Sequence, residues 1–539
     1  MNPSTSLDTT KDYSRFLFFG ILLSYCWQYA PFGINETDGG FITAYAWRIL
    51  QGEWPYQDFI YVRPPGSLWI RALEMQLLPT NWAILGERCL FYGKMAVVSY
   101  LGARMLLKGS RVWWAATLGF VLSVHNYPAA AWHTVDGILF SVLALYLASR
   151  SSSGWLLGGI CALLAMLCKQ SFYPLLAVWV TLVLCLWGWR KGLVALLWLV
   201  ALWGLFLWGM QWMGLLADYL HWTSGASSLQ EALQRGVVDY VRLHPVVLAT
   251  AVFLVLAFVG QERGWSWHSW TWHAFLLSVM AIYVWRIYQN QDFTVPIKES
   301  RWLFLLAVAW LLRRLFLLWQ TGLPMREWAE EGAEWMQTAA LLSVAWMASI
   351  SWGYNFPILY SLPVAVIGIW MGEEMGGKGS PWLRMLFLLL LLLVFRFAYH
   401  YVYRDGVRTE MSCQLESVFP KLKGVRSSEA TCDKYRSLAK WHQRYGDCYS
   451  VLPSFPLAHY LTDSQNPLPL DWVIRPEYNG QASYWQQVLD EFDKSCVLLL
   501  ERSYEEDQLQ TAKFEITQQV REGWKLLDRD GHFEVYRRE

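Results

Sequence analysis

Long unbroken runs of apolar residues constrain this chain more than any other feature of its sequence. Three of them cover residues 193–210, 246–259 and 386–394, and none leaves a polar face for water. With their apolar flanks, such runs approach the length that crosses a hydrocarbon core of about 30 Å. Charged residues make up only 16% of the 539 residues, whereas soluble chains are usually nearer a quarter. The sequence therefore predicts a membrane protein.

Counting the apolar runs predicts an all-α polytopic membrane bundle of about thirteen transmembrane helices within residues 1–402. The helices are expected near residues 14–31, 87–107, 112–130, 135–149, 155–168, 171–189, 192–215, 245–261, 272–289, 302–319, 335–352, 355–372 and 383–402. Basic residues set the orientation, because short cytoplasmic loops are enriched in Lys and Arg. A cytoplasmic N-terminus places nearly all short basic loops on one side, and the odd number of spans then places the C-terminal part on the other.

The C-terminal part, residues 403–539, is much more polar and reads as a small extracytoplasmic α/β domain. Helix-like stretches near 484–492 and 507–520 alternate with strand-like ones near 496–500 and 533–537. Four cysteines in this part could form two disulfides in an oxidising compartment, with three possible connectivities: Cys413, Cys432, Cys448 and Cys496. The net charge of +1 and the lack of a basic arm argue against a nucleic-acid partner.

The long loop after the first apolar run, residues 31–86, carries the most distinctive polar residues. Asp38 is expected at the mouth of the helix bundle, where a reduced dielectric raises the basicity of a carboxylate and lets it accept a proton from a hydroxyl. Gly39 and Gly40 remove side-chain bulk beside it, so that a substrate can approach closely. The alternative is that Asp38 only caps the following helix.

The motif in this loop resembles the GT-C superfamily of membrane glycosyltransferases, in particular bacterial relatives of protein O-mannosyltransferases and lipid A aminoarabinose transferases. A Gly-rich run that ends at Lys169 and Gln170, and a late segment with Tyr354 and Asn355, resemble the family more weakly. The matching positions in the loop are Asp38, Gly40, Phe41, Arg48, Leu50, Gly52, Pro55, Tyr56, Asp58, Phe59, Arg63, Pro64, Pro65 and Gly66.

The resemblance implies a transferase of the EC 2.4 class that uses a polyprenyl-phosphate sugar as donor. The acceptor would be an extracytoplasmic envelope glycan, lipid A or its core, or a protein. Asp38 would act as general base in an inverting displacement, while fixed cations stabilise the leaving phosphate. The family often has Asp-Glu at this point, but Gly39 follows here, so no metal and no other cofactor are expected. The implied location is the bacterial inner membrane, with the C-terminal domain in the periplasm.

Three cations are candidates for binding the donor phosphate. Lys169 lies on the far side, against the basic-inside pattern, and a lysine there is costly without an anionic partner; snorkelling to the headgroups is the alternative. Arg63 is held beside a stiff Pro-Pro pair. Arg301 opens an apolar run, where an ion pair with Glu299 or an interfacial anchor would also explain it.

The other candidates for substrate binding are polar or aromatic. His133 and Asp136 lie one helical turn apart and could face one another, although Asp136 would also serve as a helix cap. Tyr56 and Asp58 belong to the motif, and for Asp58 a structural role is the alternative. Tyr354 would line the donor pocket. In the late segment this chain has Leu359 where the family often has His, so no role of that His is expected here.

Two other functions are compatible with a chain of this kind. A transporter or flippase of a lipid-linked substrate would also have many spans, but such proteins usually contain internal repeats and mid-membrane charges. A noncatalytic membrane scaffold would do its work through the C-terminal domain. The expected partners are the lipid-linked donor, the acceptor and membrane lipids, and no particular oligomeric state is predicted.

Overall fold

The computed structural model describes residues 13–124, 129–130, 132–151, 153–224, 234–238, 325–350, 401–402, 405–479, 482–502 and 515–539, together with isolated positions between 252 and 312. The described part before residue 351 is helical. Its helices are α1 (Ser14–Gln28), α2 (Asp38–Leu50), α3 (Gly66–Leu77), η1 (Thr80–Trp82), α4 (Ala83–Leu106), α5 (Ser110–Val124), α6 (His133–Arg150), α7 (Gly154–Cys168), η2 (Gln170–Phe172), α8 (Leu175–Trp187), α9 (Trp189–Trp212), α10 (Leu216–Ser224), the π-helical turn η3 (Gln234–Val238) and α17 (Met325–Ser349).

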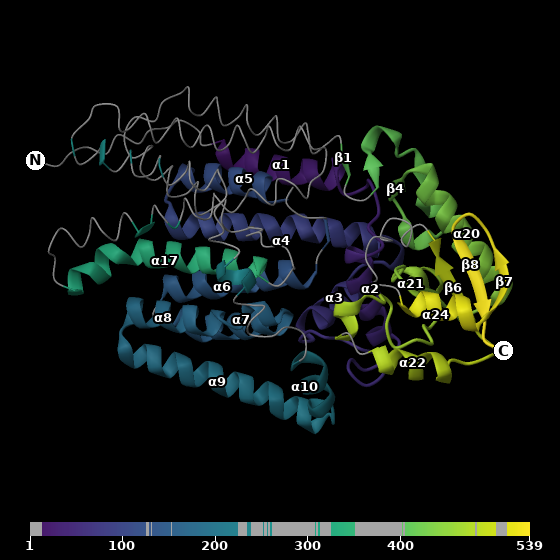
Figure 1. Ribbon diagram of the computed structural model, residues 1–539. Helices are drawn as coiled ribbons and strands as arrows, with labels where there is room; N and C mark the ends of the chain where they lie inside the picture. The colour runs from purple at the N-terminus through teal and green to yellow at the C-terminus, as the bar shows by residue number, and fades with distance from the viewer. Residues whose placement is uncertain are drawn as a thin grey trace, which may run out of the picture.

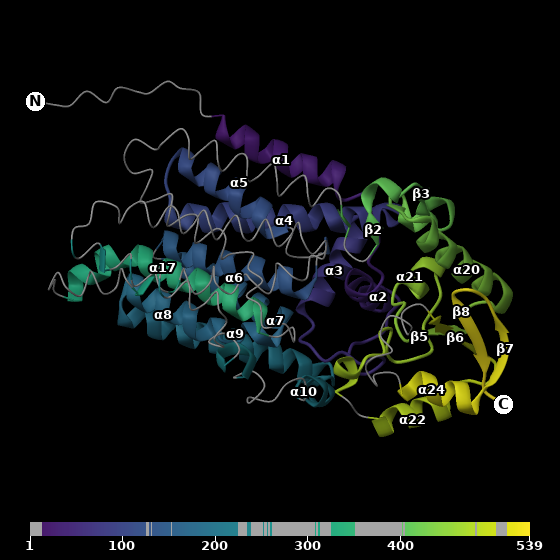
Figure 2. The same ribbon diagram turned by 45° about the horizontal axis from the view of Figure 1, so that its top comes forward.

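The long helices run side by side and form a bundle, seen on the left of Figure 1. Helix α6 packs against α4 and α7, α5 against α1 and α4, and α8 against α9 and α17. The shorter helices α2 and α3 lie at one end of this bundle, between it and the C-terminal part of the chain (Figures 1 and 2). The segment that carries Asp38 is therefore placed where the two parts of the molecule meet.

The prediction of about thirteen transmembrane helices is wrong. Within the described ranges, two stretches are long and apolar enough to cross a membrane, Gln170–Trp187 and Trp189–Trp212. For five of the predicted spans the structure describes only a few positions or none. These are the spans near 245–261, 272–289, 302–319, 355–372 and 383–402. The other eight are helical, but most of them do not meet the requirements for crossing a membrane.

Length and charge explain this difference. Helices α1, α5 and α7 each have 15 residues, which at 1.5 Å per residue gives about 22 Å, less than the hydrocarbon core. Helix α4 has 24 residues, but its apolar sequence is interrupted by Glu87, Arg88 and Lys94, which are mostly buried against other helices. An apolar run in the sequence therefore marks a helix without showing whether that helix spans a membrane.

The C-terminal part contains the sheets of the described chain. Strand β5 (Tyr449–Leu452) pairs in parallel with β6 (Val497–Glu501), which pairs antiparallel with β8 (Phe533–Arg537), and β8 pairs antiparallel with β7 (Lys525–Arg529). Two smaller sheets join β1 (Tyr401–Val402) to β2 (Gly406–Val407), and β3 (Cys413–Gln414) to β4 (Arg426–Ser427). Helices and turns of this part are η4 (Arg408–Glu410), η5 (Leu415–Ser417), η6 (Pro420–Leu422), α20 (Glu429–Tyr445), α21 (Ala458–Thr462), η7 (Arg475–Tyr478), α22 (Ala482–Glu491) and α24 (Glu515–Gly523).

Side chains that alternate along strand β6 belong to two hydrophobic cores, one on each face of the four-stranded sheet. Val497 and Leu499 share a core with α20, whereas Leu498 and Leu500 share the other core with residues of α22 and α24. Successive side chains of a strand point to opposite faces, so helices cover both faces of this sheet. Ser428 caps the start of α20, because its side chain accepts a hydrogen bond from the Thr431 amide, and Gly446, whose φ is 73°, caps its end.

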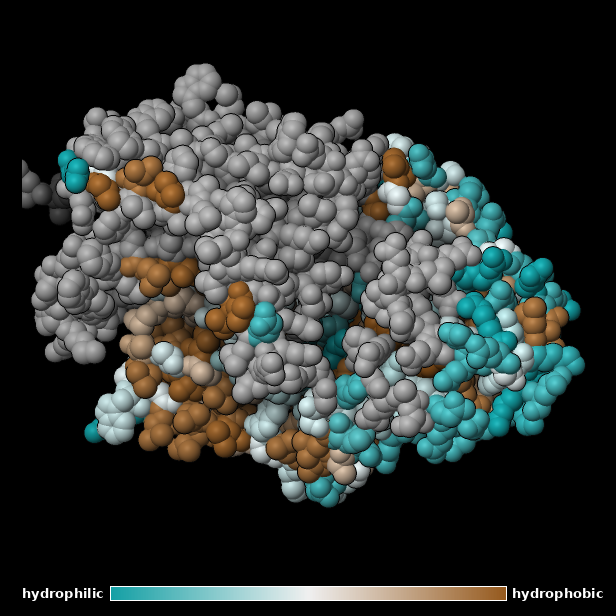
Figure 3. All heavy atoms as spheres, viewed as in Figure 1, coloured by the Kyte–Doolittle hydropathy of each residue, from teal (hydrophilic) through white to brown (hydrophobic). Residues whose placement is uncertain are grey.

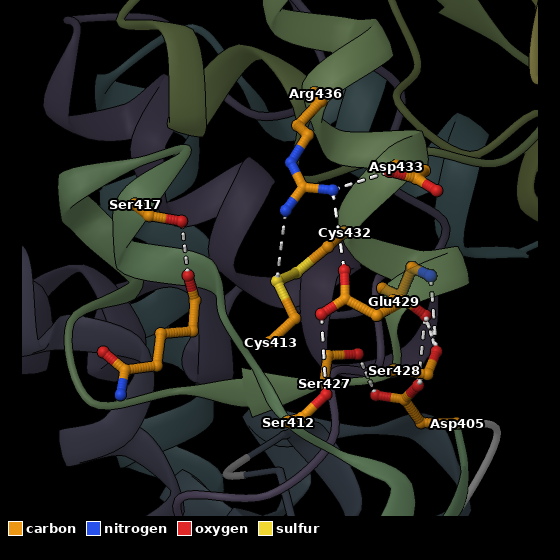
Figure 4. Close-up of a disulfide and its surroundings, with 12 residues drawn as sticks. Asp405, Ser412, Cys413, Ser417, Ser427, Ser428, Glu429, Cys432, Asp433 and Arg436 are labelled. Atoms are coloured by element: carbon orange, nitrogen blue, oxygen red, sulfur yellow. Dashed lines mark hydrogen bonds and ion pairs between the residues drawn. A yellow bond between two sulfur atoms is a disulfide. The ribbon is translucent and has the colours of Figure 1, made fainter.

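The four cysteines of this part form two disulfides. Cys413 pairs with Cys432 and Cys448 with Cys496, with Cα–Cα distances of 6.4 and 4.7 Å. Figure 4 shows the first bond, which ties β3 to α20 beside the side chain of Arg436. In the same view Asp405 accepts hydrogen bonds from Ser427 and Ser428. The pairing selects one of the three connectivities that the sequence allows.

The C-terminal part is joined to residues 31–66 by backbone and side-chain bonds. The Gly33 amide donates to the Arg426 carbonyl, and the Arg426 amide donates to the Pro31 carbonyl, both at 2.7 Å. The Ile60 amide donates to the Pro469 carbonyl at 2.8 Å. Because these bonds connect positions about 400 residues apart in sequence, the loop that carries the motif is packed between the bundle and the C-terminal sheet.

Candidate functional site

Asp38 is the first residue of α2, Thr37 is the N-cap residue, and the Asn35 side chain lies beside this helix start. The Asn35 side-chain carbonyl accepts from the amides of Thr37 and Asp38, at 3.2 and 3.1 Å, and from the Thr37 hydroxyl at 2.9 Å. The Asn35 amide also approaches the Asp38 carboxylate, at 3.5 Å. Since Thr37 holds the N-cap position, Asp38 is not the N-cap. Its side chain is half-buried.

The two glycines after Asp38 have different surroundings. A Cβ at Gly40 would lie 2.8 Å from the Leu457 side chain, whereas a Cβ at Gly39 would lie 3.5 Å from Ala130, an ordinary contact. Gly40 therefore lets α2 pack closely against the C-terminal part. The sequence suggested that both glycines make room for a substrate, but the described contacts give Gly40 a packing role instead.

Arg63 forms the central ion pair of the site. Its two terminal nitrogens donate to the two carboxylate oxygens of Glu477, both at 2.6 Å. The guanidinium also lies 5.2 Å from the centre of the Phe41 ring, one turn after Asp38 on α2. Burial alone would lower the pKa of Arg63, but the Glu477 carboxylate outweighs that effect and raises it above the ordinary value. The Tyr56 hydroxyl donates to the Arg63 carbonyl at 2.7 Å and fixes the backbone there.

Lys169 lies directly after α7 and is buried, with only 4% of its surface exposed. Its ammonium donates to the Thr134 hydroxyl at 3.0 Å and lies 5.8 Å from the Trp132 ring centre. Burial, and then the nearby charge of Arg63, lower the pKa of Lys169 well below its ordinary value. An anion placed beside it would oppose both effects, because an opposite charge favours the protonated amine.

His133 and Asp136 open helix α6 but are not hydrogen-bonded to each other. The buried Nδ1 of His133 has no hydrogen-bond partner among the described residues, and its ring packs edge-on to Phe41 with centroids 6.5 Å apart. Asp136 accepts from the Ser67 hydroxyl at 2.8 Å and pairs with Lys94 at 2.6 Å. Asp136 therefore belongs to a buried ion network of the bundle and is not a helix cap, whereas His133 lies beside the Arg63 cluster.

The remaining predicted residues are placed as follows. Tyr56 is buried and adopts a positive φ of 75° in the turn before Arg63. Asp58 is exposed, and its carboxylate accepts the Trp54 amide at 2.6 Å within that turn, which fits the structural alternative. Arg301 and Tyr354 lie outside the described residues.

Sequence reasoning missed two partners of the cluster. Glu477 lies outside the motif, yet it is 3% exposed and pairs with a residue 414 positions earlier. No local pattern in the sequence could have shown that pairing. Tyr61 is buried with its hydroxyl unpartnered among the described residues, and its ring lies 6.3 Å from Phe41. Its place in the Tyr-Val-Arg-Pro-Pro segment could have identified it.

A second arginine of the motif, Arg48, has a different environment. It donates to Glu53 at 2.6 Å, to Asp471 at 3.1 Å and to the Leu468 carbonyl at 2.9 Å. Three acceptors satisfy this guanidinium within the protein, so Arg48 holds α2 against the C-terminal part. Arg63, in contrast, is held in the described structure by the oxygens of one carboxylate.

One group of three potential metal ligands occurs in the described ranges, Cys448, Asp493 and Cys496. Two of these sulfurs form a disulfide, so the group does not make a metal site. The candidate site thus consists of the Arg63–Glu477 pair, Lys169 and an aromatic wall that includes Phe41, Tyr61 and Trp132, together with Asp38, which lies one helical turn before Phe41 on α2. No family model, curated protein or solved structure matches the chain.

Proposed function

We propose that the chain is a membrane-associated glycosyltransferase that moves a sugar from a polyprenyl-phosphate donor to an extracytoplasmic hydroxyl. The observation that carries this proposal is the cluster of Arg63 and Lys169 beside an aromatic wall, of which Phe41 lies one helical turn after the half-buried Asp38. Asp38 and Phe41 share a face of α2, and Arg63 packs on Phe41. A general base beside fixed cations is what displacement of a phosphate leaving group requires.

In the proposed reaction, the acceptor oxygen attacks the anomeric carbon of the donor. The bond between that carbon and the phosphate oxygen breaks, and the phosphate leaves with the electron pair. The acceptor proton passes to the Asp38 carboxylate. Arg63 and Lys169 stabilise the charge that develops on the leaving phosphate, and because the fold already holds them in place this needs little reorganisation.

The exposed apolar surface supports a lipid-linked donor. Side chains along α9 point outward and are about half exposed or more, among them Leu193, Leu197, Val200, Leu205 and Trp208. Figure 3 shows this apolar surface over the region of α8 and α9, while hydrophilic residues cover the C-terminal part. Extended exposed apolar patches mark contact with a partner or a membrane. The two disulfides support an oxidising compartment, such as the periplasm, for the C-terminal part.

The test is the variant Asp38→Asn in membranes or detergent, assayed with polyprenyl-phosphate sugars and with native mass spectrometry to identify lipids that co-purify. Transfer is expected to fall by about 10²–10⁴-fold, the usual contribution of a general base. Asp218→Asn is the matched control, because Asp218 is also a half-buried carboxylate in the first turn of a helix, α10. It should keep full transfer.

Unchanged transfer in Asp38→Asn, with a verified donor and intact folding, would rule out the mechanism. Net flux of the lipid-linked sugar across vesicles, without any transfer, would instead identify a flippase. The two results are separable because transfer changes the mass of the acceptor and flux does not.

A further inference from the structure

The carboxylate of Glu477 binds the guanidinium of Arg63 with the geometry that a phosphate would use. Its two oxygens face the two terminal nitrogens of the guanidinium at equal distances of 2.6 Å. Arginine binds carboxylates and phosphates through this same bidentate geometry. The pair is largely removed from water, with 17% of the Arg63 side chain and 4% of the Glu477 side chain exposed.

We infer that Glu477 is an acidic plug, which holds the phosphate position of the donor and must be displaced when a donor binds. This inference rests on the proposed function, because it assigns Arg63 to the donor phosphate. It adds a regulatory element that comes from the C-terminal part of the chain. The site would therefore exist in two states, one closed by Glu477 and one occupied by the phosphate of the lipid.

The turn that carries Glu477 is suited to such a movement. Turn η7 is four residues long, and the Glu477 amide donates to the Ile474 carbonyl at 2.8 Å. Asn479 follows in a left-handed conformation with φ of 52°, and its side chain donates to the Trp222 carbonyl of α10 at 3.0 Å. The carboxylate thus sits on a short turn that spans from the sheet to the helix bundle.

Displacement of Glu477 has a physical consequence for this turn. A buried carboxylate that loses its cation is strongly unfavourable, so Glu477 could not stay in place once a phosphate took Arg63. The turn would have to move and carry the carboxylate toward water. Donor binding would in this way open the contact between the C-terminal part and the loop that carries Arg63.

The alternative is that the Arg63–Glu477 ion pair is purely structural. The Arg48–Asp471 pair is an example of a structural ion pair. Arg48 keeps Glu53 and the Leu468 carbonyl as acceptors if Asp471 is neutralised. Arg63 has Glu477 as its acceptor in the described structure, so a phosphate would replace one bidentate partner by another. Asp471 and Glu477 are both buried carboxylates of the same segment that pair with arginines of the motif, which makes Asp471 the matched control.

The experiment measures binding and not transfer. Geranyl phosphate is titrated by calorimetry into the full chain, and geraniol serves as the probe without phosphate. Glu477→Gln keeps the shape of the side chain but loses its charge, so geranyl phosphate should bind at least about tenfold more tightly than to the wild type. Asp471→Asn should bind as the wild type does. Geraniol should not distinguish the three proteins, and Arg63→Met in the Glu477→Gln background should remove the gain.

Equal affinity of geranyl phosphate for the wild type and Glu477→Gln, or an equal gain in Asp471→Asn, would overturn the plug. Absence of binding to all of these proteins would overturn it as well. If Glu477→Gln does not fold, Glu477→Asp is used, which retains the charge but shortens its reach, and an intermediate gain is expected. Failure of the plug leaves the outcome for Asp38→Asn unaffected, because that test reads transfer.

Discussion

At the scale of single residues, the buried His459 of the C-terminal part has a defined tautomer. The Thr462 hydroxyl donates to the Ala458 carbonyl at 3.0 Å, so the Ser464 hydroxyl, 2.9 Å away, must donate to Thr462. Ser464 then accepts from the Nδ1–H of His459, also at 2.9 Å. This chain fixes the neutral tautomer of a ring that is 4% exposed. Burial, followed by the charges of Arg48 and His442, lowers its pKa to about 3.

The shifted pKa of His459 predicts a loss of stability in acid. Below the ordinary value of 6.5 the unfolded chain takes up a proton that the folded chain refuses until about pH 3. Stability is therefore full above 6.5 and falls as the pH drops toward 3, by up to about 5 kcal/mol for this group. His459→Asn, which keeps an acceptor or donor near Ser464, should flatten the difference in thermal midpoint between neutral and acidic buffer. If the thermal midpoint of the variant depends on pH as that of the wild type does, the assignment of this acid sensitivity to His459 is wrong.

The residues of the site show where sequence reasoning succeeds and where it stops. The motif pointed to Arg63, and the side chains of Arg63, Lys169 and His133 indeed lie near one another. The acidic partner of Arg63 was not predictable, because Glu477 reaches it from 414 positions away in the sequence. A pattern of residue types within thirty positions carries no information about such contacts.

At the scale of secondary-structure elements, the start of α2 offers a sharp test of packing. Gly39→Ala should be neutral or stabilise by up to about 1 kcal/mol, because Ala favours a helix over Gly and its Cβ meets an ordinary contact. Gly40→Ala should destabilise by about 1–3 kcal/mol, since its Cβ would lie 2.8 Å from Leu457. Unfolding midpoints measure both changes.

The control for the Gly40 prediction is a double-mutant cycle with Leu457→Ala. Removing the Leu457 side chain should make Gly40→Ala nearly neutral while leaving the effect of Gly39→Ala unchanged. Equal effects of the two alanines in the wild-type background would show that α2 does not need its close approach to the C-terminal part.

The helices themselves were largely predictable, whereas their relation to a membrane was not. Strand β8 has the bounds of the strand-like stretch expected from the sequence, and β6 is shifted by one residue at each end from the expected stretch. Apolar runs located α4 and α6, but charges inside them are paired across helices: Arg71 with Glu87 at 2.7 Å, and Lys94 with Asp136 at 2.6 Å. Pairing of this kind appears only when the fold is known.

At the scale of the whole molecule, the two disulfides are the covalent constraint on the C-terminal part. They close loops of different length, with sequence separations of 19 and 48 residues. In the chain-entropy account the longer loop gives more stability, by about 1 kcal/mol at room temperature. Replacing Cys448 and Cys496 by Ser should therefore lower the unfolding midpoint more than replacing Cys413 and Cys432. Peptide mapping without reductant should find both bonds, and swapped partners would refute the assignment.

The bonds between residues 31–66 and the C-terminal part also determine when the site can exist during synthesis. Arg48 and Arg63 leave the ribosome early, yet Asp471 and Glu477 are made 423 and 414 residues later. Until then Arg48 has Glu53, five residues away, as an acidic partner, whereas the Arg63 guanidinium must be satisfied by water, lipid headgroups or a chaperone. The Arg63–Glu477 pair is consequently one of the last parts of the protein to form, and a nascent chain that stops before residue 471 would lack both Asp471 and Glu477.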